Sequence, residues 1–254
     1  MPAHPKRLRD LEAGVSSPDV TEAVVLAGGL GTRLRSAVPD LPKSMAPVAG
    51  RPFLAWLLDS LAAQGIRRVV LSVGYRSEVI VDFFGQQYGN MSIDYATEPE
   101  PLGTGGGIAC GLAQIEGTES FVLNGDTFQA FDYRAMAALF HRHGGATMAM
   151  GVREVADASR FGELSVTDGR VRGFSARGDG SGLVSAGIYL LPRDLFERFR
   201  VPRKFSFEAD FLQTRIDELK PIAFTCGGVF IDIGMPDAYR EAQQLLPSLL
   251  AIES

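Results

Sequence analysis

Residues 23–34 read AVVLAGGLGTRL, a short apolar run followed at once by a glycine-rich segment. The run predicts a buried strand over residues 23–26 that leads into a tight turn. Glycines in such a turn let the backbone come close to a ligand, with its N–H groups facing phosphate oxygens. The segment matches neither G-x-G-x-x-G nor G-x-x-x-x-G-K-[ST], so a plain strand-to-helix turn is an equally good interpretation of it alone.

Outward from this stretch, strand patterns alternate with helical patterns. The alternation predicts an α/β fold: a Rossmann-like, three-layer αβα arrangement in which helices cover both faces of a mostly parallel sheet. Ligands of such sheets bind at the carboxyl ends of the strands. The expected strands cover residues 23–26, 69–73, 93–96, 121–123 and 147–152, and the expected helices cover 53–64, 78–87, 108–115 and 134–143.

The pattern changes after residue 151. Apolar runs at 162–166 and 171–174 flank an Asp-Gly turn, which predicts an antiparallel hairpin. Further strands are expected at 183–190, 222–224 and 229–231, with helices at 194–199, 207–219 and 236–246. We expect residues 1–20 to form a loosely ordered tail and residues 21–254 to form one domain, with halves of about 21–150 and 151–254.

Composition excludes several classes of protein. The chain has 25 Lys and Arg against 30 Asp and Glu, a formal charge of −5, so it lacks the basic face that binds nucleic acid. Apolar residues make up 46% and charged residues 22%, which is typical of a globular protein. No apolar stretch reaches the roughly 20 residues of a membrane span, and no leader pattern is present, so we expect a cytoplasmic protein without a membrane partner.

Two further segments have features of a binding site. Prolines stiffen the stretch around Lys43, although a lone lysine is usually solvated surface. Residues 98–108 carry four glycines between a strand and a helix, where bare backbone can meet a flat base or simply begin the helix. Arg33, beside the first glycine-rich turn, offers paired donors to a phosphate.

Two aspartates complete the pattern. Asp126 follows the strand at 121–123, where a turn or a helix cap is the ordinary interpretation. Asp232 lies between branched apolar residues, where a carboxylate seldom occurs without a partner or a metal. Taken together, the glycine-rich loops, the two cations and the two aspartates favour a phosphate site with a hard divalent cation.

The motifs AVVLAGGLGTRL, LPKSMAPV, EPLGTGGGI, VLNGD, FSFEADFL and VFIDIGMPDAY occur in this order, and the series resembles the sugar-1-phosphate nucleotidyltransferases from about Val24 to about Gln243. The resemblance implies that Arg33 and Lys43 act in catalysis and that Asp126 and Asp232 hold Mg²⁺. It implies a nucleotide site of Leu26, Ala27, Gly28, Gly29, Gly31 and Thr32, with Glu98, Gly103 and Thr104 facing the base and ribose. Gly162, Arg177, Ser185 and Glu208 would bind the sugar phosphate.

Within the family, NGDTF, SRFGELSV and GLVSAGIYLL are most similar to a branch that transfers GMP from GTP to D-glycero-α-D-manno-heptose 1-phosphate for cell-surface polysaccharides. The alternatives are mannose 1-phosphate guanylyl transfer, N-acetylmuramate 1-phosphate uridylyl transfer, and a non-catalytic subunit that binds a sugar nucleotide. Relatives form homodimers or homotetramers, so we expect one of these.

The sequence departs from the family pattern on the sugar side. Ala176-Arg177 stands where relatives have Glu-Lys, Ser185 where Asn is usual, and Ser44 where Pro is usual. Arg177 still offers a fork of donors to a phosphate. The attacking phosphate oxygen is already anionic, so no base is needed, and we expect the three histidines to be bystanders.

Overall fold

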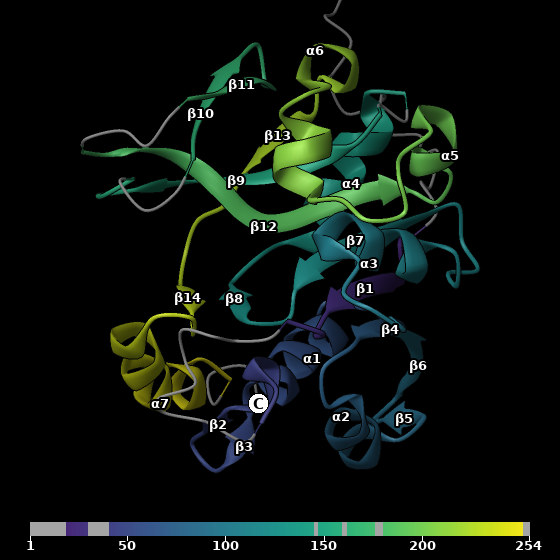
Figure 1. Cartoon of the computed structure of the whole chain (residues 1–254). Helices are drawn as coiled ribbons and strands as arrows, with labels where there is room; N and C mark the ends of the chain where they lie inside the picture. The colour runs from purple at the N-terminus through teal and green to yellow at the C-terminus, as the bar shows by residue number, and fades with distance from the viewer. Residues whose placement is uncertain (1–18, 30–40, 145–146, 159–161, 176–179, 251–254) are drawn as a thin grey trace, which may run out of the picture.

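The computed structural model describes residues 19–29, 41–144, 147–158, 162–175 and 180–250. Its centre is a parallel group of strands (Figure 1). In this group β1 (Glu22–Leu26) lies between β7 (Glu119–Asn124) and β4 (Arg68–Val73), and β6 (Met91–Thr97) pairs with β4. The carboxyl ends of all four strands therefore meet at one edge, which confirms the prediction from the alternating pattern.

Helices cover both faces of these strands, because the strand residues are apolar on both sides. Ala23 and Val25 of β1 are buried with α1 (Phe53–Ala63) and α4 (Tyr133–Arg142), whereas Val24 packs against α3 (Gly103–Leu112) on the other face. The helix α2 (Ser77–Phe84) lies on the α1 side. The three-layer αβα arrangement is thus confirmed.

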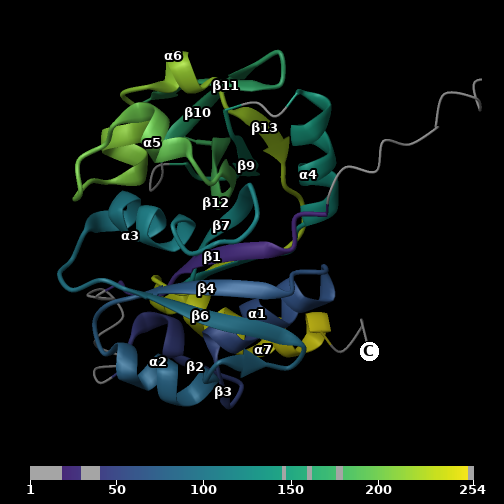
Figure 2. The ribbon, with the colours of Figure 1, turned by 90° about the vertical axis from the view of Figure 1, so that its right-hand side faces the viewer.

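The second half extends the same sheet with antiparallel strands. The long strand β12 (Gly182–Pro192) pairs with β7 on one side and with β9 (Ala149–Val155) on the other. The full strand order of the sheet is β10-β11-β13-β9-β12-β7-β1-β4-β6-β5. In Figure 2, β4 and β6 lie on one side of β1, whereas β7, β12 and β9 lie on the other side. One continuous sheet therefore runs through both halves.

The predicted hairpin is present as β10 (Glu163–Thr167) and β11 (Arg170–Ser175). Its turn residues Asp168 and Gly169 have φ angles of 52° and 69°, as a two-residue hairpin turn of the I′ type requires. The strand β13 (Ile222–Thr225) pairs in parallel with β9. Among the described residues, no helix is both long enough and apolar enough to cross a bilayer.

Several helix boundaries differ from the sequence expectation, and the helix expected at 236–246 continues to residue 250. The helix expected at 78–87 ends at Phe84, because Gly85 takes a φ of 59° and the chain continues into β5 (Gln87–Tyr88). The helix expected at 207–219 is divided into a π-helix, η3 (Phe207–Leu212), and α6 (Ile216–Leu219). The helix expected to begin at residue 108 begins at Gly103, so most of the second glycine-rich loop is helical.

Short strands outside the main sheet pack on the C-terminal helix. The strand β14 (Phe230–Asp232) pairs with β8 (Thr127–Gln129), and β2 (Pro47–Val48) pairs with β3 (Arg51–Pro52). A 3-10 turn, η2 (Lys43–Met45), precedes β2. The helix α5 (Leu195–Phe199), which follows β12, is not part of this group and packs on η3 instead. The helix α7 (Pro236–Leu250) buries Ala242 and Leu246 against this group. These contacts fix the positions of β14, β8 and η2.

Candidate active site

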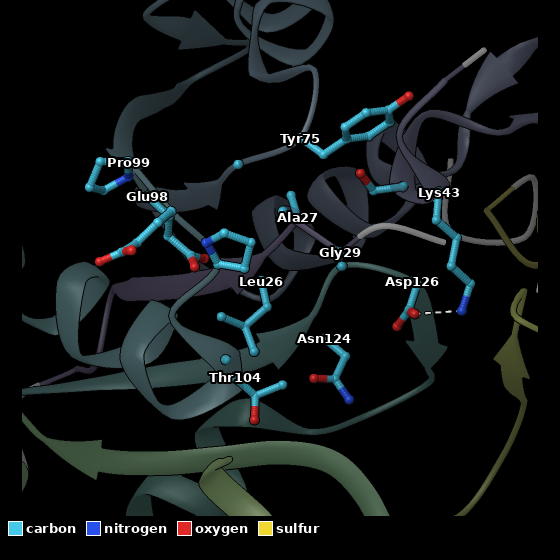
Figure 3. Close-up of a pocket in the computed structure, with 17 residues that line it drawn as sticks. Leu26, Ala27, Gly29, Lys43, Tyr75, Glu98, Pro99, Thr104, Asn124 and Asp126 are labelled. Carbon is cyan, nitrogen blue, oxygen red and sulfur yellow. Dashed lines mark hydrogen bonds and ion pairs between the residues drawn. The ribbon is translucent and has the colours of Figure 1, made fainter. Parts of the chain in front are cut away.

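A cavity of about 680 Å³ opens where the parallel strands end (Figure 3). Each of the four strands contributes the residues that follow it, as expected for ligands of a parallel sheet. The lining residues are Leu26, Ala27, Gly28 and Gly29 from β1; Gly74 and Tyr75 from β4; Glu98, Pro99, Glu100, Pro101, Gly103 and Thr104 from β6 to α3; Asn124, Gly125 and Asp126 from β7; and Lys43 and Ser44.

Most of the predicted nucleotide and catalytic positions lie on this lining. They are Leu26, Ala27, Gly28, Gly29, Lys43, Glu98, Gly103, Thr104 and Asp126. Gly31, Thr32, Arg33 and Arg177 fall outside the described residues, so their roles stay predictions. Asp232 reaches the cavity wall through Lys43, and Gly162 is exposed beside Phe174 at the start of β10, away from the lining.

Lys43 and the two aspartates form one charged group. Lys43 Nζ lies 2.5 Å from Asp126 Oδ2 and 3.2 Å from Asp232 Oδ1. The pairing of β14 with β8 sets Asp232 opposite Thr127, and the Ile233 N–H donates to the Asp126 carbonyl at 3.1 Å. Residues from three distant parts of the sequence therefore meet at one point. Figure 3 shows Lys43 and Asp126 at one end of the cavity and Glu98 and Pro99 at the other.

The two aspartates are held in fixed orientations. Asp232 Oδ1 accepts a hydrogen bond from the Gly234 N–H at 2.7 Å, and Asp126 Oδ1 accepts one from Thr127 Oγ1 at 3.2 Å. A Cβ atom at Gly234 would lie 2.4 Å from Lys43 Nζ and 2.9 Å from Asp232 Oδ1. Glycine at position 234 therefore leaves the space that Lys43 Nζ occupies beside Asp232.

The carboxylates of Asp126 and Asp232 fit Mg²⁺ that also binds substrate phosphates and water. They are too few to hold a metal ion with protein ligands alone. The described residues contain no group of three or more His, Cys, Asp or Glu side chains that could hold a metal. Two carboxylates beside a large open cavity leave room for substrate phosphates and water, which is the coordination that Mg²⁺ prefers. The arrangement is thus consistent with a divalent cation that binds together with its phosphate ligand.

The two glycines of the first turn have different surroundings. The Ala27 N–H donates to the Ser72 carbonyl at 2.8 Å, which ties the end of β1 to β4. A Cβ atom at Gly28 would lie 2.9 Å from the Gly74 nitrogen, so this glycine is required by packing of the two strand ends. Gly29 lines the cavity and has open space where a Cβ would be, so its backbone is free to meet a ligand.

Glu98 shapes the other end of the cavity. Its Oε2 accepts a hydrogen bond from the Leu102 N–H at 2.9 Å, and its Oε1 accepts one from Ser72 Oγ at 3.2 Å. These contacts fold residues 98–102 around the carboxylate. The contact of Glu98 with base and ribose remains a prediction, and the structure adds a role in holding this loop.

The start of α3 packs closely on residues 205–207. Phe205 N donates to the Leu102 carbonyl and Gly105 N donates to the Phe205 carbonyl, both at 3.0 Å. A Cβ at Gly103 would lie 2.5 Å from the Phe205 oxygen, and one at Gly105 would overlap the Phe205 ring. The glycines therefore let η3 approach α3, which explains why the helix begins earlier than expected.

Ser185 and Glu208, predicted to bind the sugar phosphate, are connected through a residue that the sequence analysis did not single out. The Tyr189 hydroxyl donates to Glu208 Oε1 at 2.7 Å and lies 3.0 Å from Ser185 Oγ. Ser185 lies in β12, and Glu208 is an exposed residue of η3. The structure thus brings these two predicted residues together.

Several lining residues were missed. Gly74 and Tyr75 directly follow the strand expected at 69–73, and Asn124 precedes the predicted Asp126, so position after a strand was the available signal. Ser44 is buried, and its hydroxyl has no hydrogen-bond partner in the described ranges. Of the histidines, His141 contacts Glu119 and His143 is exposed, and neither lines the cavity.

Comparison with known proteins gives consistent matches over most of the chain. The model of the nucleotidyl transferase family matches residues 22–248. A D-glycero-alpha-D-manno-heptose 1-phosphate guanylyltransferase from Aneurinibacillus thermoaerophilus is 41% identical over 89% of this chain and 98% of its own length. HddC from Yersinia pseudotuberculosis, solved in complex with GMP-PN, superposes with a TM-score of 0.76 at 35% identity, over 89% of this chain and 99% of that one. A mannose-1-phosphate guanylyltransferase from Mycobacterium tuberculosis is 33% identical over 86% of this chain and 62% of its own length.

Proposed function

The chain belongs to the nucleotidyl transferase family, and on that premise we propose that it transfers GMP from GTP to D-glycero-α-D-manno-heptose 1-phosphate. The products are GDP-heptose and pyrophosphate. A relative that carries this activity in its name is matched along 98% of its length. The solved relative with GMP-PN bound supports a guanine nucleotide as the donor.

One observation carries the proposal: a cation and two carboxylates converge at one end of an open cavity of about 680 Å³. The other end, around Glu98 and Pro99, combines the prolines Pro99 and Pro101 and the backbone of Gly103 with the polar side chains of Glu98 and Thr104, and we assign this end to the base and ribose. A nucleoside triphosphate has the same division between a flat base and a charged tail. Bound in this direction, its phosphates meet Lys43 and the aspartates.

The reaction needs charge control more than proton transfer. An oxygen of the sugar phosphate attacks the α-phosphorus, and the bond to pyrophosphate breaks. The attacking oxygen is already anionic, which agrees with the absence of histidine from the described lining. We assign Lys43 and Arg33 the role of offsetting the charge of the two approaching phosphates.

We propose that Asp126 and Asp232 hold Mg²⁺. When bound, Mg²⁺ neutralises phosphate charge and orients the triphosphate. Lys43 contacts both aspartates, so it keeps the two carboxylates together until the cation and its phosphates arrive.

On the sugar side we propose Gly162, Arg177, Ser185 and Glu208 as the residues that receive the sugar phosphate, and residues 151–254 as the half that carries them. Mannose 1-phosphate and N-acetylmuramate 1-phosphate are the alternative acceptors, the latter with UTP as the donor. A subunit that binds a sugar nucleotide without turnover is the alternative from another class of protein.

The test is a matrix of GTP, UTP and ATP against heptose, mannose and N-acetylmuramate 1-phosphates, read as pyrophosphate release with Mg²⁺. We expect the highest kcat/KM for GTP with the heptose phosphate. Faster turnover with UTP contradicts the guanylyl assignment, and binding without turnover in every combination supports the non-catalytic alternative. Asp126→Asn and Asp232→Asn are expected to remove activity with an unchanged circular dichroism spectrum.

A further inference from the structure

Three polar side chains form a hydrogen-bonded line with a fixed direction. The Tyr189 hydroxyl has one proton, which it donates to Glu208 Oε1 at 2.7 Å. Ser185 Oγ, 3.0 Å away, must therefore donate to the Tyr189 oxygen. The Gly187 N–H donates to Ser185 Oγ at 3.2 Å and completes the line at its other end. Every donor in the line points toward the carboxylate of Glu208.

An irregularity in β12 makes this line possible. The pairing of β12 with β9 shifts register between Ser185 and Tyr189, and Gly187 within that segment has a φ of 69°. In a regular strand, Cα atoms four residues apart are separated by about 13 Å. The irregular segment, together with the length of the tyrosine side chain, lets Ser185 Oγ meet the Tyr189 hydroxyl.

The ring of Tyr189 is firmly held. Only 3% of the residue is exposed, and its ring packs edge-to-face on Phe207 with centroids 4.9 Å apart. The Phe207 N–H donates to Thr104 Oγ1 at 2.9 Å, so the neighbouring ring is itself anchored to the cavity wall. Burial raises the pKa of Tyr189 well above its ordinary value, and the adjacent Glu208 adds to the effect. The hydroxyl is therefore a permanent donor at neutral pH.

The line lies behind the cavity lining and adjoins it at two points. Gly187 backs onto Asn124, since a Cβ at Gly187 would lie 2.8 Å from Asn124 Nδ2. Asn124 and Thr104 both line the cavity. Glu208 is exposed, and within the described residues its second oxygen, Oε2, has no hydrogen-bond partner. One carboxylate oxygen is thus fixed by the protein and the other is available to a ligand.

We propose that Tyr189 is a positioning residue for sugar recognition: it fixes Glu208 so that the second carboxylate oxygen accepts a hydrogen bond from a ring hydroxyl of the sugar phosphate. The inference rests on the proposed function and adds how the site selects its sugar. An ionised carboxylate only accepts hydrogen bonds, so the site requires a hydroxyl donor at that position of the sugar. Sugars that lack the hydroxyl cover this carboxylate oxygen without offering it a donor, and we expect them to bind less tightly.

The test compares Tyr189→Phe with Tyr133→Phe. Tyr133 is 2% exposed and lies in the layer of α4, so the control removes the same atom from an equally buried ring away from the cavity. Tyr189→Phe is expected to raise the KM for the sugar phosphate about tenfold, the size expected for a lost charge-assisted hydrogen bond, and to leave the KM for GTP unchanged. The preference of the enzyme for the natural sugar over its deoxy analogues is expected to fall by a similar factor.

A double-mutant cycle shows whether Tyr189 acts through Glu208. In a Glu208→Ala background, Tyr189→Phe is expected to have no further effect on the KM for the sugar phosphate. Unchanged kinetics in Tyr189→Phe overturn the proposal. Equal increases in both KM values with a lowered Tm also overturn it, because they show a general structural role.

Failure of the proposed function gives a different result. If the wild-type protein uses another nucleotide or another sugar phosphate, the same comparison is made with that pair. Calorimetric titration of the sugar phosphate into wild type and Tyr189→Phe gives the affinity ratio without turnover. An equal affinity of the two proteins for the sugar phosphate that the wild type binds contradicts the role of Tyr189, whichever nucleotide is the donor.

Discussion

Lys43 is the residue through which the charged end of the cavity is organised. The Lys43 ammonium contacts the carboxylates of both Asp126 and Asp232. Its positive charge balances two carboxylates that would otherwise repel each other at short range. Its side chain is 11% exposed, so these contacts are poorly screened by water. Lys43 is the first residue of the 3-10 turn η2, which lies between Pro42 and Pro47. The two prolines restrict the backbone of this segment and so keep Lys43 in place.

Replacement of Gly234 tests how strictly Lys43 must be placed. In Gly234→Ala the new methyl group lies 2.4 Å from the present position of Lys43 Nζ, so we expect the flexible lysine to shift away from Asp232. We expect kcat/KM to fall at least tenfold, which corresponds to about 1.4 kcal/mol, with little change in Tm. Steady-state kinetics and thermal unfolding measure the two effects.

Gly227→Ala is the matched control, because a Cβ at that position meets no atom within 4 Å. It is expected to match the wild type in both measurements. Normal activity in Gly234→Ala shows that Lys43 has no strict position and removes the argument for its role.

At the scale of elements, the contact between α3 and η3 joins the two halves of the site. Thr104 lines the cavity, and its hydroxyl accepts the Phe207 N–H at 2.9 Å, one residue before Glu208. The substitution Thr104→Val keeps the shape of the side chain but removes the hydroxyl that accepts the hydrogen bond from the Phe207 N–H. Because one hydrogen bond contributes about 1 kcal/mol, we expect a roughly fivefold rise in the KM for the sugar phosphate.

Thr104→Ser keeps the acceptor and is expected to behave like the wild type. The kinetics also decide between two roles of Thr104. A rise in the KM for GTP alone supports the predicted contact with the base and contradicts a link to η3.

The opposite edge of the sheet is held by a charged cluster around Glu22. Its carboxylate accepts hydrogen bonds from the Glu116 and Gly117 N–H groups and pairs with Arg68. Burial raises the pKa of Glu22, but these hydrogen bonds and Arg68 outweigh burial, so the pKa lies below its ordinary value of 4.5. The cluster joins the starts of β1 and β4 to the segment before β7.

The lowered pKa gives a pH-dependent contribution to stability. Since the folded-state pKa lies below the unfolded value, ionised Glu22 stabilises the fold above pH 4.5, and this stabilisation is lost as the pH falls through the folded-state pKa. Glu22→Gln is expected to lower the free energy of unfolding by about 2 kcal/mol at pH 7. The difference from wild type is expected to shrink below pH 4.5 in urea denaturation series.

Glu116→Gln is the control for this series, because its carboxylate is 82% exposed and its backbone N–H still reaches Glu22. Its unfolding free energy is expected to stay within about 0.5 kcal/mol of wild type at both pH values. If the difference in unfolding free energy between Glu22→Gln and wild type does not change with pH, the stabilisation does not come from the negative charge of Glu22.

For the whole molecule, ligands that fill the cavity bridge the ends of four strands and stabilise the fold. GTP with Mg²⁺ at a concentration near 100 times Kd contributes about 2.7 kcal/mol, which for a chain of this size raises Tm by roughly 5 to 10 °C. Asp232→Asn is expected to lose the part of the shift that depends on Mg²⁺. Differential scanning calorimetry with and without EDTA measures it, and an equal shift in the variant contradicts a metal at Asp232.

Much of this architecture was predictable from the sequence, because the strands are short apolar runs with clear glycine boundaries. A position directly after a strand predicted Gly28, Gly29 and Asp126 near the ligand, and the family resemblance added Leu26 and Ala27; all five lie on the cavity wall. Asp232 was predicted from its charge among branched apolar residues, although its contact with Lys43 depends on the pairing of β14 with β8.

Tertiary contacts that leave no local pattern explain what the sequence did not predict. The early start of α3 depends on Phe205, a hundred residues away, which fits only against glycines. The contact between Ser185 and Tyr189 depends on an irregular register in β12, and the π-helical form of η3 is likewise a feature without a local sequence pattern. No periodicity of apolar residues predicts either feature.

The position of β12 limits how acceptor choice can be changed by recombination between homologues. This strand belongs in sequence to the second half, yet it is hydrogen-bonded to β7 from Ile188 to Pro192 and to β9 from Gly182 to Leu190. Because β7 and β9 both precede β12 in the sequence, a chimera with a crossover point inside residues 182–192 pairs the rest of β12 with partner strands from the other parent. Exchange of the sugar-reading segment between homologues is therefore expected to give folded enzymes when β7, β9 and β12 are inherited from the same parent.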